Sequence, residues 1–212
     1  MKILILGAAG QISRMLTERL LKETNDDLIL FARKADHRLE NPNPDRVSII
    51  SGDFNDHTSL EAAMTNVDIV YLNDMNLPEA TKNVVSIMKR YNIPMIIGAT
   101  ILGIYDEVIG EFGKWNARMV GTTGTDRHKR SAEIIENSGL AYTLLRLTWL
   151  YNQADNLIYT TSKKGEPFIG AQVTREAVTQ LILTILNDPT EYKNTSLGVS
   201  EPNTDFSKPS FY

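Results

Sequence analysis

The chain has 212 residues, of which 42 % are hydrophobic and 23 % charged, with a formal net charge of −4. This acidic balance argues against nucleic acid and anionic membranes as partners, and we expect neither. The absence of cysteine excludes disulfides, a thiolate nucleophile and cysteine-ligated metals. We therefore expect a cytoplasmic protein with no membrane-spanning segment. The sequence carries no information on oligomeric state.

An apolar run of strand length opens the chain and ends at a glycine-containing turn, Gly7-Ala8-Ala9-Gly10-Gln11-Ile12. An amphipathic helix then begins at Ile12. Gly7 permits a tight turn, and Gly10 lacks the Cβ that would keep a pyrophosphate at a distance. The free N–H groups at the start of the helix then face the anion. The turn predicts a dinucleotide site whose residues are Gly7, Ala9, Gly10, Gln11 and Ile12.

Strands and helices are expected to alternate along the rest of the chain. Strands are predicted at 27–31, 47–50, 67–72, 94–98, 141–146 and 196–199. Helices are predicted at 58–64, with Asp56 as its N-cap, and at 78–91, 126–137 and 175–187. Residues 33–44 form a polar loop, 100–122 a long connection of the kind that is usually functional, and 147–172 an irregular segment. The pattern is typical of one domain over 1–212, an α/β Rossmann-type doubly wound parallel sheet in three α/β/α layers.

Ligands of such sheets bind outside the carboxyl ends of the strands. After the second strand stand Arg33 and Lys34, where NAD-selective sites carry an acidic residue for the ribose hydroxyls. Two cations suit the 2′-phosphate of NADP instead, and a solvated basic loop is the alternative. We expect NADP as the cofactor, with NAD possible.

The next strand ends supply further cofactor contacts. Asp53 is placed to bind an adenine amino group with Phe54 beside it, although an aspartate there could equally cap a helix turn. Asn73, Asp74 and Met75 follow the fourth strand and are expected along the middle of the cofactor.

Two segments are expected at the nicotinamide end of the site. Ala99 and Thr100 follow the fifth strand. Thr148, Trp149 and Leu150 follow the sixth, where an aromatic side chain could stack on a substrate or belong to the core.

Four stretches together resemble the atypical short-chain dehydrogenase/reductases, and more narrowly their NAD(P)H-binding, NmrA-like and biliverdin-reductase-B-like branch. These stretches are Gly7–Ile12, Gly52–Asp53, Arg146–Leu150 and Val173–Val178. The resemblance covers nearly the whole chain. It implies an NADP-type Rossmann domain in which residues 147–212 contribute a small substrate-covering region.

The chain departs from the catalytic Tyr-x-x-x-Lys pattern of those enzymes. Lys129 matches the lysine, but Thr125 stands where the tyrosine belongs. A threonine hydroxyl is a far weaker acid than a phenol beside an ammonium group. Lys129 could bind the nicotinamide ribose or be a solvated residue in a basic run. Thr100 and Lys129 are therefore the candidate catalytic residues.

The three histidines, His37, His57 and His128, are scattered and lack metal-ligand spacing, so each is predicted to be a surface or loop residue. No metal site is expected.

The leading hypothesis is an NAD(P)H-dependent oxidoreductase that passes hydride to a small organic acceptor such as a flavin, a quinone or another conjugated compound. Such acceptors can take their proton from water, which makes the missing tyrosine less important. The alternative is a non-catalytic, NADP-binding sensor of the NmrA-like type. A nucleotide-sugar epimerase is disfavoured because the chain lacks both the large C-terminal domain and the tyrosine of those enzymes.

Overall fold

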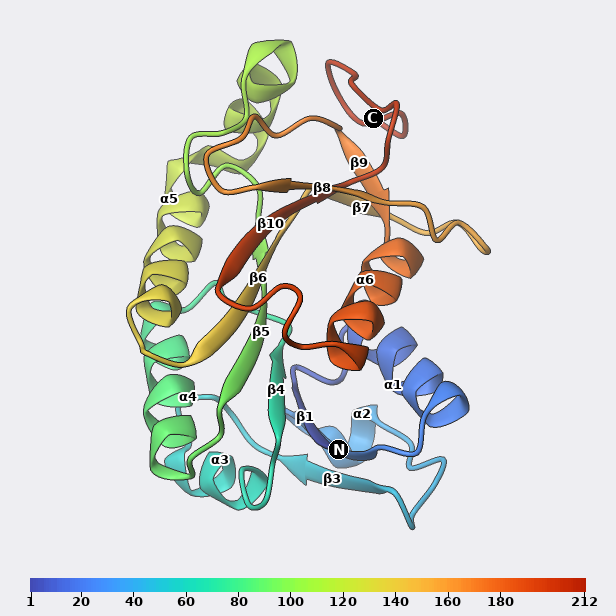
Figure 1. Ribbon diagram of the computed structural model, residues 1–212, viewed down its shortest axis with the longest axis vertical. Coiled ribbons are helices and arrows are strands. Elements are labelled where there is room, and N and C mark those ends of the chain that lie inside the picture. Colours follow the sequence, from blue (N-terminus) through green and yellow to red (C-terminus); the bar gives the residue numbers. More distant parts are fainter.

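The computed structural model describes all 212 residues as one domain built on a central sheet (Figure 1). The eight strands of this sheet lie in the order β3-β2-β1-β4-β5-β6-β10-β8, all parallel except β8. The elements are β1 (Lys2–Leu6), α1 (Gln11–Glu23), β2 (Asp27–Ala32), α2 (Ala35–Arg38), β3 (Val47–Ser51), α3 (His57–Ala63), β4 (Ile69–Leu72), α4 (Pro78–Arg90), β5 (Met95–Ile101), α5 (Gly110–Glu136), β6 (Ala141–Leu147), β7 (Trp149–Tyr151), β8 (Thr160–Lys163), β9 (Gln172–Thr174), α6 (Arg175–Asn187) and β10 (Thr195–Ser200). The predicted doubly wound Rossmann-type sheet is confirmed.

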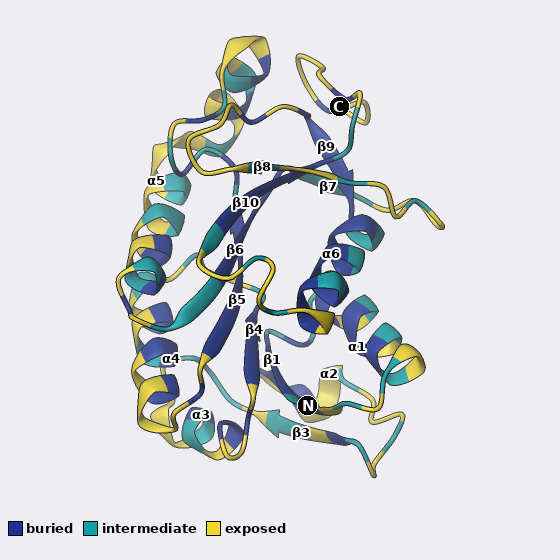
Figure 2. Ribbon diagram, viewed as in Figure 1, coloured by how far each residue is buried: buried dark blue, intermediate teal, exposed yellow.

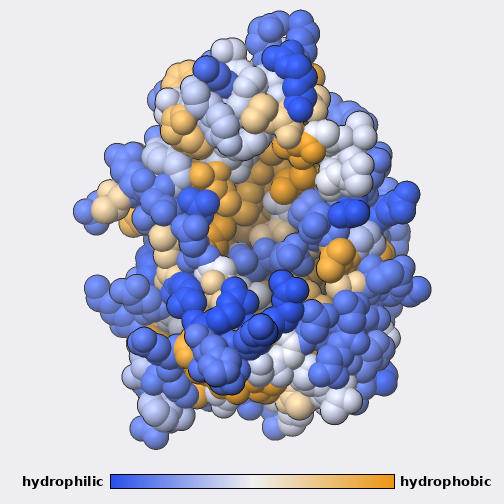
Figure 3. Space-filling model, turned by 180° about the vertical axis from the view of Figure 1, so that it is seen from behind, coloured by the Kyte–Doolittle hydropathy of each residue, from blue (hydrophilic) through white to orange (hydrophobic).

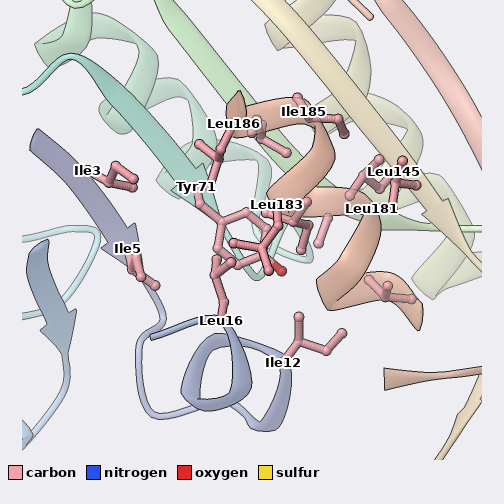
Figure 4. Packing of buried hydrophobic residues seen from close by; sticks show 14 of the residues in the cluster. Ile3, Ile5, Ile12, Leu16, Tyr71, Leu145, Leu181, Leu183, Ile185 and Leu186 are labelled. Carbon is pink, nitrogen blue, oxygen red and sulfur yellow. The ribbon is translucent and has the colours of Figure 1, made fainter. Parts of the chain in front are cut away.

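The sheet separates two hydrophobic cores, because successive side chains of a strand point to opposite faces. In β1, Ile3 and Ile5 face the core covered by α1 and α6, whereas Leu4 and Leu6 face the core under α3, α4 and α5. Figure 4 shows the first core, with Ile12 and Leu16 of α1 and Leu181 of α6 packed against the strands. The central strands are accordingly buried, and exposed residues lie on the outer sides of the helices (Figure 2).

The register of the strands brings their carboxyl ends to one edge. Leu6 of β1 pairs with Phe31 of β2 on one side and with Leu72 of β4 on the other. The chain order reverses at β1, and open α/β sheets bind ligands at such a switch point. The residues that follow β1, β2, β4, β5 and β6 are thereby collected into one crevice.

Residues 100–122 do not form the long connection expected from the sequence. Strand β5 continues to Ile101, and α5 already begins at Gly110. Gly121, with φ +70° and ψ 176°, breaks the helical backbone inside this element. Phe112 and Asn116 are buried on the first half of α5, so packing holds a glycine-rich segment in a helix.

Two other segments are more regular than predicted. The polar loop at 33–44 contains the short helix α2, which follows Lys34 in a left-handed conformation, φ 52°. The stretch 147–172 contains β7 and β8, and β9 begins at its end. β7 pairs with β9 in a separate small sheet, and β8 extends the main sheet beside β10. The expected cap of α3 is confirmed, since Asp56 accepts hydrogen bonds from the N–H groups of Thr58 and Ser59.

Every helix is too short or too polar to traverse a lipid bilayer.

Candidate functional site

The turn after β1 has the geometry of a phosphate cradle. Gly7 has φ +84°, a backbone conformation that residues with a side chain rarely adopt. Gly10 is the N-cap of α1, and no side chain caps the helix. The N–H groups of the first helical turn are therefore available to an anion, whose charge the helix dipole favours.

Asn73, the first residue after β4, lies against this turn. The Tyr71 hydroxyl donates a hydrogen bond to Asn73 Oδ1 over 2.8 Å. Burial raises the pKa of Tyr71 far above its ordinary value, so this hydroxyl stays protonated. The amide nitrogen of Asn73 then faces the glycines, where a Cβ on Gly10 would come within 2.4 Å of it. The space beside the turn exists only because residue 10 is glycine.

A cavity of about 220 Å³ extends from this turn along the ends of β2 and β3. It is lined by Gly7, Ala9, Gly10, Ala32, Arg33, Arg38, Gly52, Asp53, Phe54, Asn73, Asp74 and Leu77. Eight of the predicted cofactor residues are in this set: Gly7, Ala9, Gly10, Arg33, Asp53, Phe54, Asn73 and Asp74.

The far end of this first cavity is basic. Arg33 and Arg38 both line it, and Arg38 Nη1 donates to the carbonyl oxygen of Arg33 over 3.2 Å. The guanidinium of Arg33 lies 3.9 Å from the Asp53 carboxylate, and its side chain is 76 % exposed. An exposed ion pair at that distance is weak, so a phosphate can displace it. Lys34 is exposed and does not line the cavity.

Asp53 and Phe54 form the side of the cavity opposite the glycine turn. Asp53 Oδ1 accepts hydrogen bonds from the backbone and side-chain nitrogens of Asn55, while Oδ2 is the atom near Arg33. This aspartate closes a turn and also borders the cavity, whereas its contact with an adenine amino group stays a prediction. Phe54 stacks on Phe31 with ring centroids 6.0 Å apart, and this contact holds its ring at the wall of the cavity.

A second cavity of about 330 Å³ adjoins the first, and Asn73 and Asp74 line both. Its other lining residues are Gln11, Ile12, Ala99, Thr100, Ile101, His128, Leu147, Thr148, Leu150 and Arg175. Six predicted site residues lie here: Gln11, Ile12, Ala99, Thr100, Thr148 and Leu150. Figure 3 shows a hollow with hydrophobic residues at its floor and hydrophilic residues along its lower rim.

His128 corrects a sequence-based expectation. It is a half-buried helical residue that lines the second cavity, not a surface or loop residue, whereas His37 and His57 are exposed as predicted. His128 Nδ1 lies 3.2 Å from Thr100 Oγ1. Burial lowers the pKa of His128 below its ordinary value of 6.5, and the Asp74 carboxylate opposes this shift.

The two residues aligned with Tyr-x-x-x-Lys do not line this cavity. Thr125 donates its hydroxyl to the Gly121 carbonyl over 3.2 Å and borders a different, polar hollow. Lys129 is half-buried on α5 but is absent from the lining. The turn of α5 that meets the cavity instead presents His128.

Two predicted cofactor residues lie behind the cavity walls. Met75 is fully buried, and its sulfur would lie 2.7 Å from a Cβ on Gly98, so it packs beneath β5. Trp149 donates its Nε1–H to Asn116 Oδ1 over 2.9 Å and packs on Trp115, with centroids 4.9 Å apart. Its flanking residues, Thr148 and Leu150, are the ones that reach the cavity.

Arg38, Leu77 and Arg175 line the cavities but were not predicted. Arg175 is the first residue of α6, and its Nη1 donates to Asn152 Oδ1 over 2.9 Å. The Asn152 amide in turn donates to Gln11 Oε1 over 3.2 Å. This chain of contacts joins the start of α1 to the C-terminal region. The position of Arg175 directly after the capping residue Thr174 was the available clue.

These features fit a dinucleotide. An uncapped helix N-terminus with a glycine cradle suits a diphosphate, and the arginine end of the first cavity suits a further phosphate. Asn73 and Asp74 line both cavities, which therefore adjoin each other.

Comparisons with known proteins agree with this geometry. A family model described as NAD(P)H-binding matches residues 7–189, whereas no curated protein sequence matches the chain. A short-chain dehydrogenase/reductase from Veillonella parvula DSM 2008, solved in complex with NADP, is 36 % identical, with a TM-score of 0.96 over 99 % of both chains. A Rossmann-fold NAD(P)-binding family protein from Shigella flexneri is 34 % identical, with a TM-score of 0.81 over 100 % of this chain and 98 % of that one.

A more distant neighbour shows likeness of fold alone. An anaerobillin reductase, ChuY, from Escherichia coli O157:H7 is 19 % identical, with a TM-score of 0.77 over 99 % of this chain and 100 % of its own. The family match and the two closer structures decide the assignment: this chain belongs to the NAD(P)H-binding family of short-chain dehydrogenase/reductase-type Rossmann proteins.

Proposed function

We propose that this protein is an NADPH-dependent reductase of a small organic acceptor, such as a flavin, a quinone or another conjugated compound. The observation that carries the proposal is the meeting of two cavities at Asn73 and Asp74. One has the glycine turn and basic end that suit a nucleotide, and the other is an adjoining cavity lined by both hydrophobic and polar residues. The solved relative that contains NADP supports the choice of cofactor.

In this proposal the protein contributes binding and orientation. The turn at Gly7 and Gly10 holds the diphosphate, and Arg33 and Arg38 hold the 2′-phosphate. Ala99, Thr148 and Leu150 shape the space in which the acceptor lies beside the nicotinamide. When bound, NADPH supplies a hydride from C4 of its nicotinamide ring. Holding two reactants in contact can supply about 7–11 kcal/mol of the barrier, so a reductase can work largely by orientation.

The lining of the second cavity supports this class of acceptor. Its lining includes Ile12, Ile101, Leu147 and Leu150, which can contact the apolar surface of such a compound. The tyrosine of ordinary carbonyl reduction is missing, and Thr125 faces a different hollow. Conjugated acceptors spread the charge that follows hydride transfer and depend less on that acid.

Tryptophan fluorescence can test both parts of the proposal in one cuvette. Trp149 lies between two residues of the second cavity, so its emission should change as NADPH is added. Riboflavin, FMN and menadione are then added separately, and absorbance reports the oxidation of NADPH. Binding followed by acceptor-dependent oxidation supports the reductase. If neither NADPH nor NADH binds, the cofactor assignment is contradicted.

A second candidate function is an NADP-binding sensor of the NmrA-like type, which binds the cofactor without turnover. The observation that favours it is the position of Thr125 and Lys129 outside the second cavity. Tight NADPH binding with no oxidation across a broad panel of acceptors would select the sensor.

The preference for NADPH can be tested by reversing one charge. Arg33→Asp places a carboxylate where the 2′-phosphate is proposed to bind. We expect NADPH affinity to fall about 10- to 100-fold, since charge-assisted hydrogen bonds contribute about 1.5–3 kcal/mol. NADH, which lacks that phosphate, should bind as well as before or better. Fluorescence titrations with both nucleotides measure the two dissociation constants.

Arg130→Asp is the matched control, because Arg130 is exposed on α5 and lines neither cavity. It makes the same change in net charge and should leave both affinities unaltered. An equal loss for NADPH and NADH in Arg33→Asp, or no loss, would rule out the phosphate-binding role.

A further inference from the structure

The second cavity contains a pair of polar side chains that has no role in the reductase proposed above. Thr100 lies near the end of β5 and is 1 % exposed, and His128 approaches it from α5. Thr100 Oγ1 and His128 Nδ1 are 3.2 Å apart, and both residues line the cavity. An imidazole thus reaches the hollow where the acceptor is proposed to lie.

The two ring nitrogens of His128 have different surroundings. Nδ1 has Thr100 as its partner, and Nε2 makes no hydrogen bond within the protein. Nε2 is also not fully buried, so a ligand or water can reach it. With Nδ1 directed at Thr100, the ring leaves its other nitrogen free.

The charged groups around this imidazole come from three elements. Asp74, which follows β4, and Arg175 of α6 line the same cavity, while Arg127 and Lys129 are its neighbours on α5. Burial lowers the pKa of His128 below 6.5, Asp74 raises it, and the burial effect is the larger. With its pKa below 6.5, His128 is mainly neutral at pH 7, and its imidazolium is a stronger acid than an unperturbed one.

We propose that His128 is the proton donor of this site and that Thr100 is its positioning residue; this inference rests on the proposed reductase function. The acceptor gains a hydride, which brings two electrons and one hydrogen, and its heteroatom is left with a negative charge. The Nε2–H bond of the imidazolium breaks and the proton passes to that heteroatom. Thr100 Oγ1 accepts the Nδ1–H bond throughout, and water returns a proton to Nε2 after the product leaves.

The first test needs no turnover. Long-range ¹⁵N–¹H NMR of the imidazoles reports the protonation and tautomer of each histidine. With three histidines in the chain, His37→Gln and His57→Gln variants assign the signals. We expect His128 to titrate below pH 6.5 in the free protein and its signals to move when NADP⁺ is added. If the His128 signals do not shift when NADP⁺ is added, the proposal is overturned, because His128 would then not face the reaction site.

The second test compares His128→Asn with the wild-type protein under saturating NADPH and menadione. The asparagine amide can still reach Thr100 but cannot donate a titrating proton. General acid catalysis typically contributes about 10²–10⁴-fold, so we expect kcat to fall about 100-fold while the Kd of NADPH is unchanged. In the wild type, kcat should rise as pH falls, since the imidazolium is the active form, and this rise should vanish in His128→Asn.

Thr100→Val removes the positioning contact. It should shift the titration of His128 in the NMR experiment and lower kcat less than His128→Asn does. Arg130→Gln, an exposed change on the same helix, should match the wild type in every measurement. Turnover by His128→Asn at the wild-type rate, with the same pH profile, would overturn the proton donor and leave the reductase standing. Failure of the wild type itself to oxidise bound NADPH would overturn the reductase and the proton donor together.

Discussion

Glu107→Gln is expected to lower the free energy of unfolding by about 3–5 kcal/mol, the usual cost of breaking a buried ion pair from one side. Glu107 lies between β5 and α5 and its side chain is 3 % exposed, while its partner Arg146 on β6 is fully buried. Arg146 Nη1 donates to Glu107 Oε1 over 2.7 Å. A neutral glutamine would leave the buried guanidinium without a counter-charge.

Glu107 also organises the backbone around it. Its carboxylate accepts the N–H groups of Gly103 and Tyr105, at 3.0 and 2.9 Å. An amide has one oxygen for these three donors and turns its NH₂ group toward one of them. Arg146 further donates to the carbonyls of Ser162 and Ser196, so the pair ties the segment after β5 to β8 and β10. That segment directly follows Ile101, which lines the second cavity together with Thr100.

Urea unfolding followed by tryptophan fluorescence measures this loss. Glu111→Gln is the matched control, since Glu111 also pairs with a cation, Lys114, at 2.8 Å, but both side chains are largely exposed. The control should change stability by less than about 1 kcal/mol. Glu107→Leu combined with Arg146→Met removes both charges and should cost less than Glu107→Gln alone. A loss below about 1 kcal/mol in Glu107→Gln would contradict the assigned role.

Much of the fold could be predicted because its signals are local. Strand β1 is a short apolar run that ends at Gly7, and the positive φ of Gly7 is the turn that a glycine there predicts. Asp56 caps α3 through its immediate neighbours. The parallel arrangement follows from strands that alternate with helices, and the carboxyl-end rule then brings Asn73, Asp74 and Thr100 into adjoining cavities.

The missed elements depend on contacts between distant residues. The first half of α5 contains Gly110 and Gly113, and glycine is a poor helix former, so the sequence favours a loop. Phe112 stacks on Trp115, and Trp115 packs against Trp149 of β7, which stabilises the helix from outside. Strand β8 is short and polar and forms only because β10 pairs with it.

The sequence pattern and the lining of the second cavity differ on α5, where the helical register decides which residue meets the cavity. The spacing of Thr125 and Lys129 matches a family pattern, but a helix turns by about 100° per residue. A shift of one position selects His128 in place of Lys129 as the residue that meets the second cavity. Sequence spacing fixes which residues share a face, whereas the packing of α5 on the sheet fixes which face meets the cavity.

Gly10→Val should weaken NADPH binding at least about 100-fold, or about 2.7 kcal/mol. The backbone of Gly10, with φ −72° and ψ 157°, suits any residue, so the substitution does not strain the turn. Its Cβ, however, would lie 2.4 Å from Asn73 Nδ2 and 3.3 Å from the Gly7 carbonyl oxygen. Asn73 cannot swing aside freely, because Tyr71 donates to its Oδ1. The added methyl groups therefore take the space proposed for the diphosphate.

Fluorescence titration with NADPH measures this effect. The urea midpoint of Gly10→Val, compared with that of the wild type, tests whether the fold is retained. Gly10→Ala adds the Cβ alone and should fall between the wild type and Gly10→Val. Gly124→Ala serves as the control, since a Cβ there meets only Val120 at 3.8 Å and should leave the affinity unchanged. Alanine in a helix is preferred to glycine by about 0.5–1 kcal/mol, so this control should gain slightly in stability. Wild-type affinity in Gly10→Val would mean that the diphosphate does not approach the turn after β1, and the cofactor path along Asn73 and Asp74 would have to be abandoned.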